Sequence, residues 1–554
     1  MRLLKSKQVT KLYLTGVILL AATLRLHNID FGLPSLWDDD EPFFLMFGLK
    51  ILKNQTLNPG WFGHPGTTTI YLISLCTAAV YATGGIIGSW ANTAEFVAAI
   101  YARPEIIMVP QRIMIVIPAL VSIWLTWRIG QFLHSAAAGL VAAAILALSP
   151  LHIELSQLIR TDVQMTMWIL WCVCAALPLC DAYRKEPLIW SSLLAGVACA
   201  TKWPGALILL VPVALVVVQP ISWTARLKRL GLSFLCSAGA LLLVSPFLLL
   251  DYRRVLANVM VEGRSRHLSQ SSSGLGETLY TYLFNVLPAA LGWPALLLGA
   301  AGLLIALRRK GPVKSAIPIA VPTLAFLGLL GLQSIMWPRW AVPMLPFLAI
   351  AAGISFAVLG ERLGKLGTSA RIAALSSAGL VLFAPLVVGA RNAAVERSND
   401  TRDLAVEWVQ SHVPATASVA VETPAIALLQ GPWPLRYPLG DLGCVDPRQA
   451  MAGHIDYEDV AHATKHRINI NLSTVAPDKL ASCRTDFIIV NEFDRYAAEA
   501  GYYPQEIANY RALLAGMKQV AVFVPAKGTN GGPVVRIFER LNVYRPACNG
   551  IKRC

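Results

Sequence analysis

The stretch AAAGLVAAAILALSPLHIELSQLIRTD, residues 136–162, is an apolar run that ends in polar and charged side chains. A helix that crosses a lipid bilayer needs about 20 predominantly apolar residues. Runs of this kind recur from Leu12 to Ala390. The sequence therefore predicts a mostly α-helical, polytopic membrane protein.

The composition of the whole chain supports this fold class. Of its 554 residues, 55% are hydrophobic and 14% are charged, and the mean hydropathy is +0.56. Soluble domains average about 25% charged residues. From about Arg391 the composition becomes that of a soluble domain, with 18 Lys and Arg against 17 Asp and Glu. We therefore expect a transmembrane catalytic domain at 1–391 and a soluble domain at 392–554.

The second domain is predicted to be a small α/β domain. A helix is expected at 400–409, and strands at 417–422, 486–491, 519–524 and 533–539. The sequence GTNGG at 528–532 is typical of a hairpin turn, since no helix start follows it. The domain has four cysteines, which allow three disulfide pairings: Cys444, Cys483, Cys548 and Cys554.

The apolar runs predict eleven membrane spans. They are placed at 10–28, 108–129, 136–156, 163–183, 187–201, 204–219, 230–250, 284–307, 315–335, 339–359 and 371–390. With the amino terminus inside, the cytoplasmic segments hold 17 Lys and Arg against 3 Asp and Glu. This asymmetry follows the positive-inside rule and predicts an extracytoplasmic second domain.

One further apolar segment, 64–82, is long enough to be a span but does not fit the count of eleven spans. A single extra crossing there would invert every later loop and contradict the charge distribution. The segment is therefore expected to lie at the outer interface. The alternative is a hairpin of two spans with 86–102, which would raise the total to thirteen.

The first outer loop contains four adjacent acids, Asp38, Asp39, Asp40 and Glu41, directly after Trp37. Adjacent carboxylates repel one another and are costly near lipid, so a purely structural purpose is hard to supply. One interpretation is a solvated loop apex or an incidental cation site. The other is a functional cluster, in which one carboxylate acts as a base while others hold an acceptor or an ion.

Further polar residues are predicted at the same outer face. They are His64, His152, Glu154, Gln157, Arg160, Asp162, Lys202 and Arg339. Each could be an ordinary ion pair or a snorkelling side chain, but their convergence on one face indicates a site. Arg264 and Arg266, in a loop at 251–283, could meet lipid headgroups or bind a phosphate.

The order of these features resembles the GT-C superfamily of polyprenyl-phosphate-sugar glycosyltransferases. It is most similar to the branch of the protein O-mannosyltransferases and the lipid A aminoarabinose transferases. The matching elements are Asp40-Glu41, His64-Pro65, Arg160-Thr161-Asp162, Ala200-Thr201-Lys202, Ser245-Pro246-Phe247 with Asp251, Arg339 with Pro343 and Pro346, and Thr401-Arg402 with Glu407-Trp408. The acidic cluster is longer than the family's Asp-Glu pair, so Asp39 is an alternative to Asp40. Gly66 after His64-Pro65 and the short Arg160–Asp162 spacing also depart from the family pattern and leave the sugar and the acceptor open.

The resemblance implies an inverting membrane glycosyltransferase. It would move a sugar from a polyprenyl-phosphate carrier to a hydroxyl of a protein, a lipid or a cell-envelope glycan. The predicted catalytic residues are Asp40, Glu41, Asp39 and Asp162; the predicted substrate-binding residues are His64, Arg160, Lys202, Arg264, Arg266 and Arg339. Since phosphate is a stable leaving group, one carboxylate as base and several cations would suffice.

The expected setting is the bacterial inner membrane, with the active site and the second domain facing the periplasm. The expected partners are the lipid-linked donor, the acceptor and the bilayer, and no nucleic acid. No metal ligands are assigned; the resemblance demands no cofactor and allows a divalent cation. The alternative function is a multi-pass transporter or flippase, a class that usually shows internal repeats and mid-membrane polar residues.

Overall fold

The computed structural model describes residues 7–263, 266–272, 274–308, 316–423, 426–449 and 470–541. The chain divides into two compact units, of which the first comprises Met1–Asp30 and Asp40–Ala393. The second comprises Phe31–Asp39 and Ala394–Cys554. A short piece of the expected first outer loop therefore belongs to the second unit.

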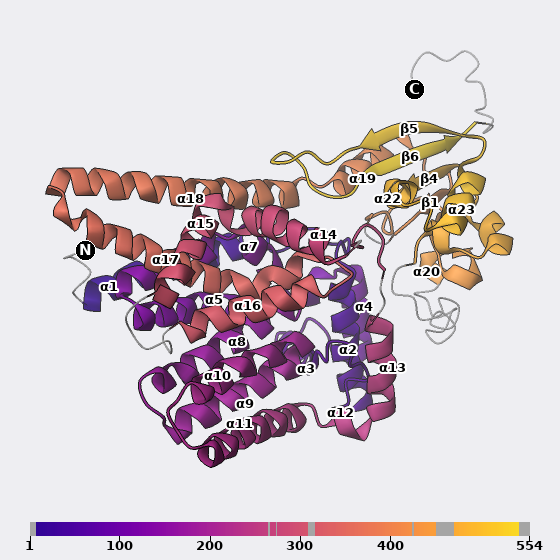
Figure 1. Cartoon of the computed structure of the whole chain (residues 1–554). Helices are drawn as coiled ribbons and strands as arrows, with labels where there is room; N and C mark the ends of the chain where they lie inside the picture. Colours follow the sequence, from indigo (N-terminus) through magenta and orange to yellow (C-terminus); the bar gives the residue numbers. More distant parts are fainter. Residues whose placement is uncertain are drawn as a thin grey trace, which may run out of the picture. The chain divides into compact units, whose positions relative to one another are not determined.

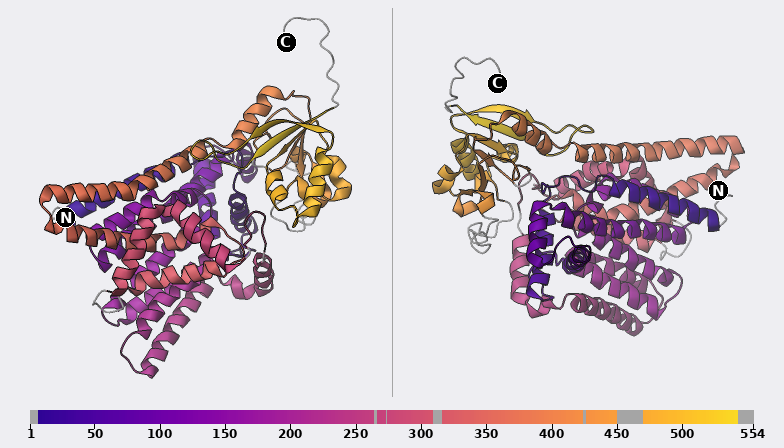
Figure 2. Two further views of the ribbon diagram at one scale, coloured as in Figure 1. Left: turned by 45° about the horizontal axis from the view of Figure 1, so that its top comes forward. Right: turned by 180° about the vertical axis from the view of Figure 1, so that it is seen from behind.

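The first unit is a bundle of helices (Figures 1 and 2). Its helices are α1 (Lys7–Leu26), α2 (Asp40–Asn54), α3 (Thr67–Ile86), α4 (Thr93–Ala102), α5 (Glu105–Leu133), α6 (Ala136–Leu148), α7 (Pro150–Ser156), α8 (Asp162–Ala176), η2 (Leu177–Cys180), α9 (Lys185–Thr201), η3 (Trp203–Leu209), α10 (Leu210–Val217), α11 (Trp223–Val244), α12 (Phe247–Leu250), α13 (Tyr252–Glu262), α14 (Leu275–Tyr280), η4 (Thr281–Val286), α15 (Leu287–Arg308), α16 (Ile317–Gly331), η6 (Pro338–Met344), α17 (Leu345–Arg362), η7 (Leu363–Lys365) and α18 (Thr368–Ser398).

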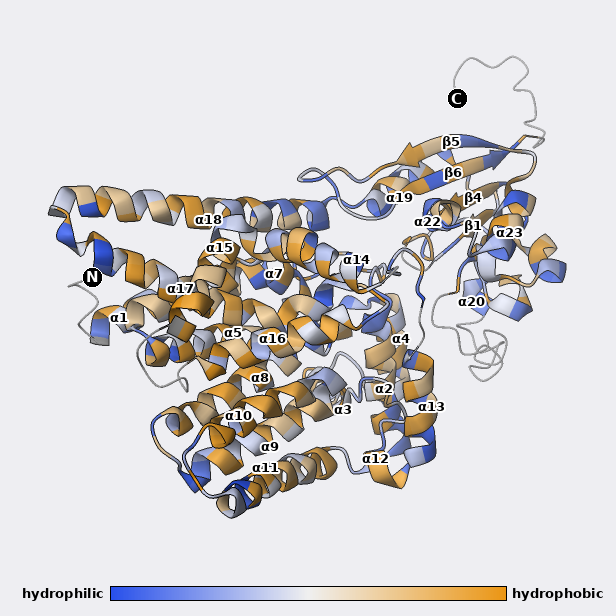
Figure 3. Cartoon of the chain, in the orientation of Figure 1, coloured by the Kyte–Doolittle hydropathy of each residue, from blue (hydrophilic) through white to orange (hydrophobic). Residues whose placement is uncertain are grey.

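Helix α17 forms the centre of this bundle and packs against α6 and α15. Small residues allow the close approach: a Cβ on Gly353 would clash with the Ala138 carbonyl oxygen of α6. A Cβ on Gly302 of α15 would meet the Ala351 carbonyl of α17. Backbone-to-backbone packing of this kind is typical of helices associating in lipid. The long helices of the unit are predominantly apolar along their length (Figure 3).

A bend of 63° separates α6 from α7 at Ser149-Pro150. The end of α6 leaves carbonyl groups without intrahelical partners. The buried guanidinium of Arg25 donates to two of them, the carbonyls of Leu146 and Ala147, at 3.3 and 3.0 Å. Arg25 Nη2 also lies 2.8 Å from His152 Nδ1. His152, which the sequence places at the outer face, is therefore a buried partner of α1.

Within the described residues, eight helices are long and apolar enough to cross a membrane, or nine if the bent pair α6–α7 is one span. The eleven spans predicted from the sequence exceed this number. The predictions at 204–219 and 315–335 fall on shorter apolar helices, Trp203–Val217 and Ile317–Gly331. The predicted span 187–201 corresponds to the 17-residue helix α9.

The segment at 64–102 contains one of the eight long helices, α3, which spans Thr67–Ile86. By length and composition α3 can cross a bilayer, although the sequence favoured an interfacial position. The second half of the alternative hairpin is α4, which has 10 residues. At 1.5 Å per residue α4 is too short to span about 30 Å of hydrocarbon.

The second unit is a mixed α/β domain with the strand order β3-β2-β1-β4-β6-β5. β1 pairs in parallel with β2 and β4, whereas β6 is antiparallel to β4 and β5. Its elements are α19 (Thr401–His412), β1 (Val419–Val421), β2 (Leu435–Pro438), η8 (Gly440–Leu442), β3 (Cys444–Val445), α20 (Pro447–Gln449), η10 (Leu472–Thr474), η11 (Pro477–Cys483), β4 (Phe487–Val490), α22 (Phe493–Ala498), α23 (Pro504–Leu514), β5 (Met517–Phe523) and β6 (Val535–Arg540).

The predicted strands and helix of this domain are confirmed as β1, β4, β5, β6 and α19. β2 and β3 were not predicted, because one ends in proline and the other has two residues. A disulfide joins Cys444 to Cys483, which is one of the expected pairings. Cys548 and Cys554 lie outside the described residues.

Candidate active site

Asp40 is the first residue of α2 and lies in a cluster of cations. Its carboxylate oxygen Oδ2 forms an ion pair with Arg160 Nη1 and lies 3.7 Å from Arg339 Nη2. Arg160 precedes α8, and Arg339 lies in the 3-10 helix η6. The side chain of Asp40 is 27% exposed, so it is accessible from outside the cluster.

The pKa of Asp40 reflects two opposing effects. Burial raises it, but the positive charges of Arg160 and Arg339 outweigh burial and hold the pKa below its ordinary value. The charge of Lys202 acts in the same direction. Asp40 is therefore an ionised carboxylate at neutral pH, and a carboxylate can accept a proton.

A second ion pair joins Lys202 at the end of α9 to Asp162 at the start of α8. Lys202 Nζ lies 2.7 Å from Asp162 Oδ1, and both side chains are at most 5% exposed. Because Lys202 also acts electrostatically on Asp40, the two pairs belong to one cluster. The cluster contains two carboxylates, Asp40 and Asp162, and three cations, Arg160, Lys202 and Arg339. Its formal excess of one positive charge suits an anionic ligand.

His64 is held beside this cluster by backbone pairing. The Trp203 N–H donates to the His64 carbonyl at 2.6 Å, and Pro65 forms an isolated β-bridge with Lys202. Burial, followed by the charge of Lys202, lowers the pKa of His64 to about 3. Among the described residues its Nδ1 has no hydrogen-bond partner. His64 is therefore a neutral imidazole at physiological pH.

Glu41 points away from solvent and forms a buried, two-pronged ion pair with Arg112 of α5. The Arg112 Nε and Nη2 atoms donate to the two carboxylate oxygens at 2.9 and 2.7 Å. Both side chains are at most 1% exposed. Glu41 Oε1 also accepts the Ile159 N–H at 3.1 Å, next to Arg160. Sequence reasoning missed Arg112, although it is a cation inside the predicted span 108–129.

Arg339 lies on an aromatic support. Its guanidinium carbon is 4.0 Å from the centre of the Trp337 ring, within the range of a cation–π contact. The His267 ring lies 4.8 Å from the same indole, and Tyr282 Oη donates to the Trp337 carbonyl at 2.9 Å. The loop that contains His267 thus helps to fix the segment that leads to Arg339.

The remaining predicted site residues are Asp39, Arg264 and Arg266. Asp39 belongs to the second unit, and Arg266 is exposed on the loop after α13. Arg264 lies outside the described residues. No group of three or more His, Cys, Asp or Glu side chains suited to a metal ion occurs in the described part of the chain. The carboxylates of Asp40 and Asp162 are both engaged by cations, so this arrangement does not fit a metal centre.

Residues 93–250 match the family model described as dolichyl-phosphate-mannose-protein mannosyltransferase. In structure the chain is similar to ArnT from Cupriavidus metallidurans bound to undecaprenyl phosphate, with a TM-score of 0.53 and 13% identity over 96% of this chain and 98% of that one. The chain has the GT-C fold. It is also similar to the Archaeoglobus fulgidus oligosaccharyltransferase in its apo form, with a TM-score of 0.53 and 13% identity over 90% of this chain and 72% of that one. No curated protein matches in sequence.

The GT-C fold confirms the resemblance drawn from the sequence and a multi-pass membrane protein with a small mixed sheet at its carboxyl end. The family match covers α4 to α12, which includes Arg160, Asp162 and Lys202 but not Asp40 or Arg339. The roles of the cluster residues therefore rest on the geometry of the cluster.

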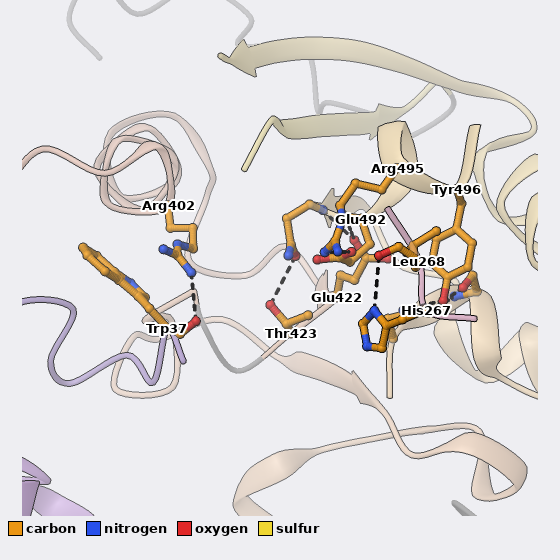
Figure 4. Close-up of polar contacts among 12 residues, drawn as sticks. Trp37, His267, Leu268, Arg402, Glu422, Thr423, Glu492, Arg495 and Tyr496 are labelled. Carbon is orange, nitrogen blue, oxygen red and sulfur yellow. Dashed lines mark hydrogen bonds and ion pairs between the residues drawn. The ribbon is translucent and has the colours of Figure 1, made fainter. Parts of the chain in front are cut away.

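The second unit contains a separate buried acid. Glu422 follows β1 and accepts the N–H groups of Asn491 and Glu492, which follow β4, at 2.5 and 2.7 Å (Figure 4). The Tyr510 hydroxyl also donates to it. Burial raises the pKa of Glu422 to about 7 in spite of these donors.

This raised pKa predicts a pH-dependent stability. Between pH 4.5, the ordinary value, and about 7, the folded protein keeps a proton on Glu422 that the unfolded chain releases. The contribution of Glu422 to stability should fall by about 3 kcal/mol as the pH rises through this window, and it should be constant outside it. Thermal unfolding of the full chain against pH, compared with Glu422→Gln, checks this. A constant difference between the two proteins from pH 4 to 8 would contradict it.

Proposed function

We propose that this chain is an inverting glycosyltransferase that moves a sugar from a polyprenyl-phosphate carrier to a hydroxyl acceptor at the outer face of a membrane. The observation that carries the proposal is the ionised Asp40 carboxylate between Arg160 and Arg339. The GT-C fold supports it, since the similar ArnT structure holds undecaprenyl phosphate and a structure of the Archaeoglobus fulgidus oligosaccharyltransferase holds a dolichol-phosphate.

The chemistry follows from the charges of the cluster. Asp40 accepts the proton of the acceptor hydroxyl while the hydroxyl oxygen attacks the anomeric carbon from the face opposite the phosphate. The bond between the anomeric carbon and the phosphate oxygen breaks, and the electron pair leaves with the phosphate. Because the attack is direct, the anomeric configuration inverts. A glycosidase needs a second carboxylic acid to protonate its leaving oxygen, whereas a phosphate leaving group does not.

The cations have two tasks in this scheme. Arg160, Lys202 and Arg339 stabilise the negative charge that builds up on the departing phosphate. Arg160 and Arg339 also depress the pKa of Asp40 in the unliganded protein. When a phosphate draws these guanidinium groups toward itself, their hold on Asp40 weakens and the carboxylate becomes a stronger base. Donor binding would thereby activate the base.

The test is a transfer assay with the purified protein and a radiolabelled polyprenyl-phosphate sugar. Mass spectrometry of the co-purifying lipid would identify the carrier. The assay would then test a panel of peptide, lipid and glycan acceptors. The expected result is a new glycosidic bond of inverted configuration. Movement of the intact lipid-linked sugar across the vesicle membrane, without transfer of the sugar to an acceptor, would instead support a flippase.

The proposed outer face of the cluster can be tested on the two sides of α18. A reporter that is active only outside the cytoplasm should be silent when fused after Lys365 and active when fused after Asn399, because the cation-rich segment at 360–371 is expected inside. The reverse pattern of activity would place the second unit in the cytoplasm.

We expect Arg339→Lys to weaken the binding of polyprenyl phosphate by about 10- to 100-fold. Lysine keeps the charge but loses the planar fork that matches a phosphate and that stacks on Trp337. A lost charge-assisted hydrogen bond costs about 1.5–3 kcal/mol, which corresponds to this range. Binding is measured with the lipid in nanodiscs. Weakening by Arg266→Ala but not by Arg339→Lys would move the phosphate site to the loop after α13.

A further inference from the structure

The segment that leads to the acidic cluster is bound within the second unit. Trp37 and Arg402 both belong to this unit, and the Arg402 guanidinium carbon lies 4.5 Å from the centre of the Trp37 ring (Figure 4). Arg402 Nη1 also donates to the Trp37 carbonyl at 3.3 Å. One side chain therefore contacts both the indole and the backbone of Trp37.

Arg402 is itself fixed in the unit. Its Nε and Nη2 atoms donate to the two Asp400 carboxylate oxygens, each at 2.8 Å. Asp400 caps the start of α19, and the neighbouring Thr401 N–H donates to the Gly531 carbonyl at 3.0 Å. Thr401 Oγ1 bonds the Pro533 carbonyl at 2.6 Å. Arg402 is thus anchored to the turn between β5 and β6.

The Trp37 ring has a second contact surface on its own segment. A Cβ on Gly32, whose φ is +71°, would lie 2.5 Å from the ring. Only glycine tolerates both this conformation and this approach. The Phe31 ring packs 6.1 Å away. The segment is therefore folded around Trp37.

We propose that Trp37 and Arg402 form a clamp that limits the movement of the chain segment leading to Asp40, with Arg402 as a positioning residue. Asp40 follows Trp37 by three residues, which span at most about 10 Å of extended chain. If the clamp holds Trp37, it restricts where Asp40 can move. This inference rests on the proposed function, since it assigns the clamp a role in setting the base.

Loss of the clamp should reduce turnover more than donor binding. A displacement of about 1 Å in a catalytic group can cost about 100-fold in rate. We expect Arg402→Ala and Trp37→Ala each to lower kcat by about 30- to 100-fold, while the affinity for polyprenyl phosphate changes less than threefold. Because both remove the same contact, the double variant should be no slower than either single variant. Arg402→Lys keeps the positive charge toward Asp400, so its kcat should lie between that of the parent and that of Arg402→Ala.

Arg536→Ala is the matched control. Arg536 also pairs with an aspartate of the second unit, Asp494, at 3.0 Å, but lies on β6. It should leave kcat within twofold of the parent. An equal loss in Arg536→Ala, or multiplicative losses in the double variant, would overturn the clamp and indicate general destabilisation.

Amide hydrogen exchange tests the clamp without an activity measurement. In Arg402→Ala and in Arg402→Lys, the amides of residues 31–42 should exchange faster, whereas those of β4 and β6 should not change. Unchanged exchange at 31–42 would overturn the clamp even if transfer is slow. Failure of the parent protein to transfer any sugar, with the exchange result as expected, would count against the proposed function alone.

Discussion

Asp40→Asn should reduce sugar transfer by about 100- to 10,000-fold, the usual cost of losing a general base. The substitution preserves the size of the side chain but replaces the basic carboxylate by a neutral amide, which is too weak a base to take the proton of a hydroxyl. It also leaves Arg160 and Arg339 without their shared anion, so binding of an anionic lipid should persist or tighten. Turnover and polyprenyl-phosphate affinity, measured on the same preparation, separate the two effects.

The neighbouring acids are the controls for this prediction. Asp38→Asn and Asp39→Asn change the same chemical group in the second unit and should retain most of the activity. A collapse of turnover in Asp39→Asn with an active Asp40→Asn would show that Asp39 is the base. Equal activity of all three variants would exclude the acidic cluster from the chemistry.

Glu41→Gln should destabilise the folded protein by about 3–5 kcal/mol, the usual cost of breaking a buried ion pair from one side. Arg112 would keep its charge in a site where it is 1% exposed and has lost its carboxylate partner. Glutamine keeps one oxygen that can accept the Ile159 N–H, but its NH2 group cannot accept from Arg112 Nη2, so the two-pronged pair is broken. The unfolding temperature in detergent or nanodiscs should fall accordingly.

The double variant Glu41→Met with Arg112→Met distinguishes a buried charge from a catalytic role. Replacing both partners by apolar side chains of similar length is often neutral for stability. We expect the double variant to recover most of the unfolding temperature, while a misplaced Arg160 keeps transfer low. Full recovery of transfer would show that Glu41 and Arg112 contribute only to the stability of the fold and not to sugar transfer. An unfolding temperature unaffected by Glu41→Gln would contradict the importance of the pair.

Much of the fold could be predicted because apolar run length and strand-like runs are local properties. The transmembrane unit, the sheet strands β1, β4, β5 and β6, and the turn at 528–532 all follow from such patterns. Span edges did not, because α6 is broken at Ser149-Pro150 and its end is satisfied by Arg25, which lies more than 120 residues away in sequence. No local pattern reveals such a long-range partner.

The candidate site could likewise be predicted only in part. Charged residues that interrupt apolar sequence pointed to Asp40, Arg160, Lys202 and Arg339, which the structure brings into one cluster. The sequence did not predict different roles for Asp40 and Glu41, since nothing in the sequence shows which way each of two adjacent carboxylates points. Successive helical residues point in directions about 100° apart, so one carboxylate meets the arginines of the cluster and the other is buried against Arg112.

The bond between Cys444 and Cys483 makes the second unit sensitive to the compartment in which it folds. It closes a loop over a sequence separation of 39 residues, and the chain-entropy estimate for such a loop is about 4 kcal/mol. Such bonds persist in oxidising surroundings and are rare in a glutathione-reduced cytosol. A second unit retained in the cytosol would lose this restraint on its unfolded state, so its yield and protease resistance would report on which side of the membrane it matured.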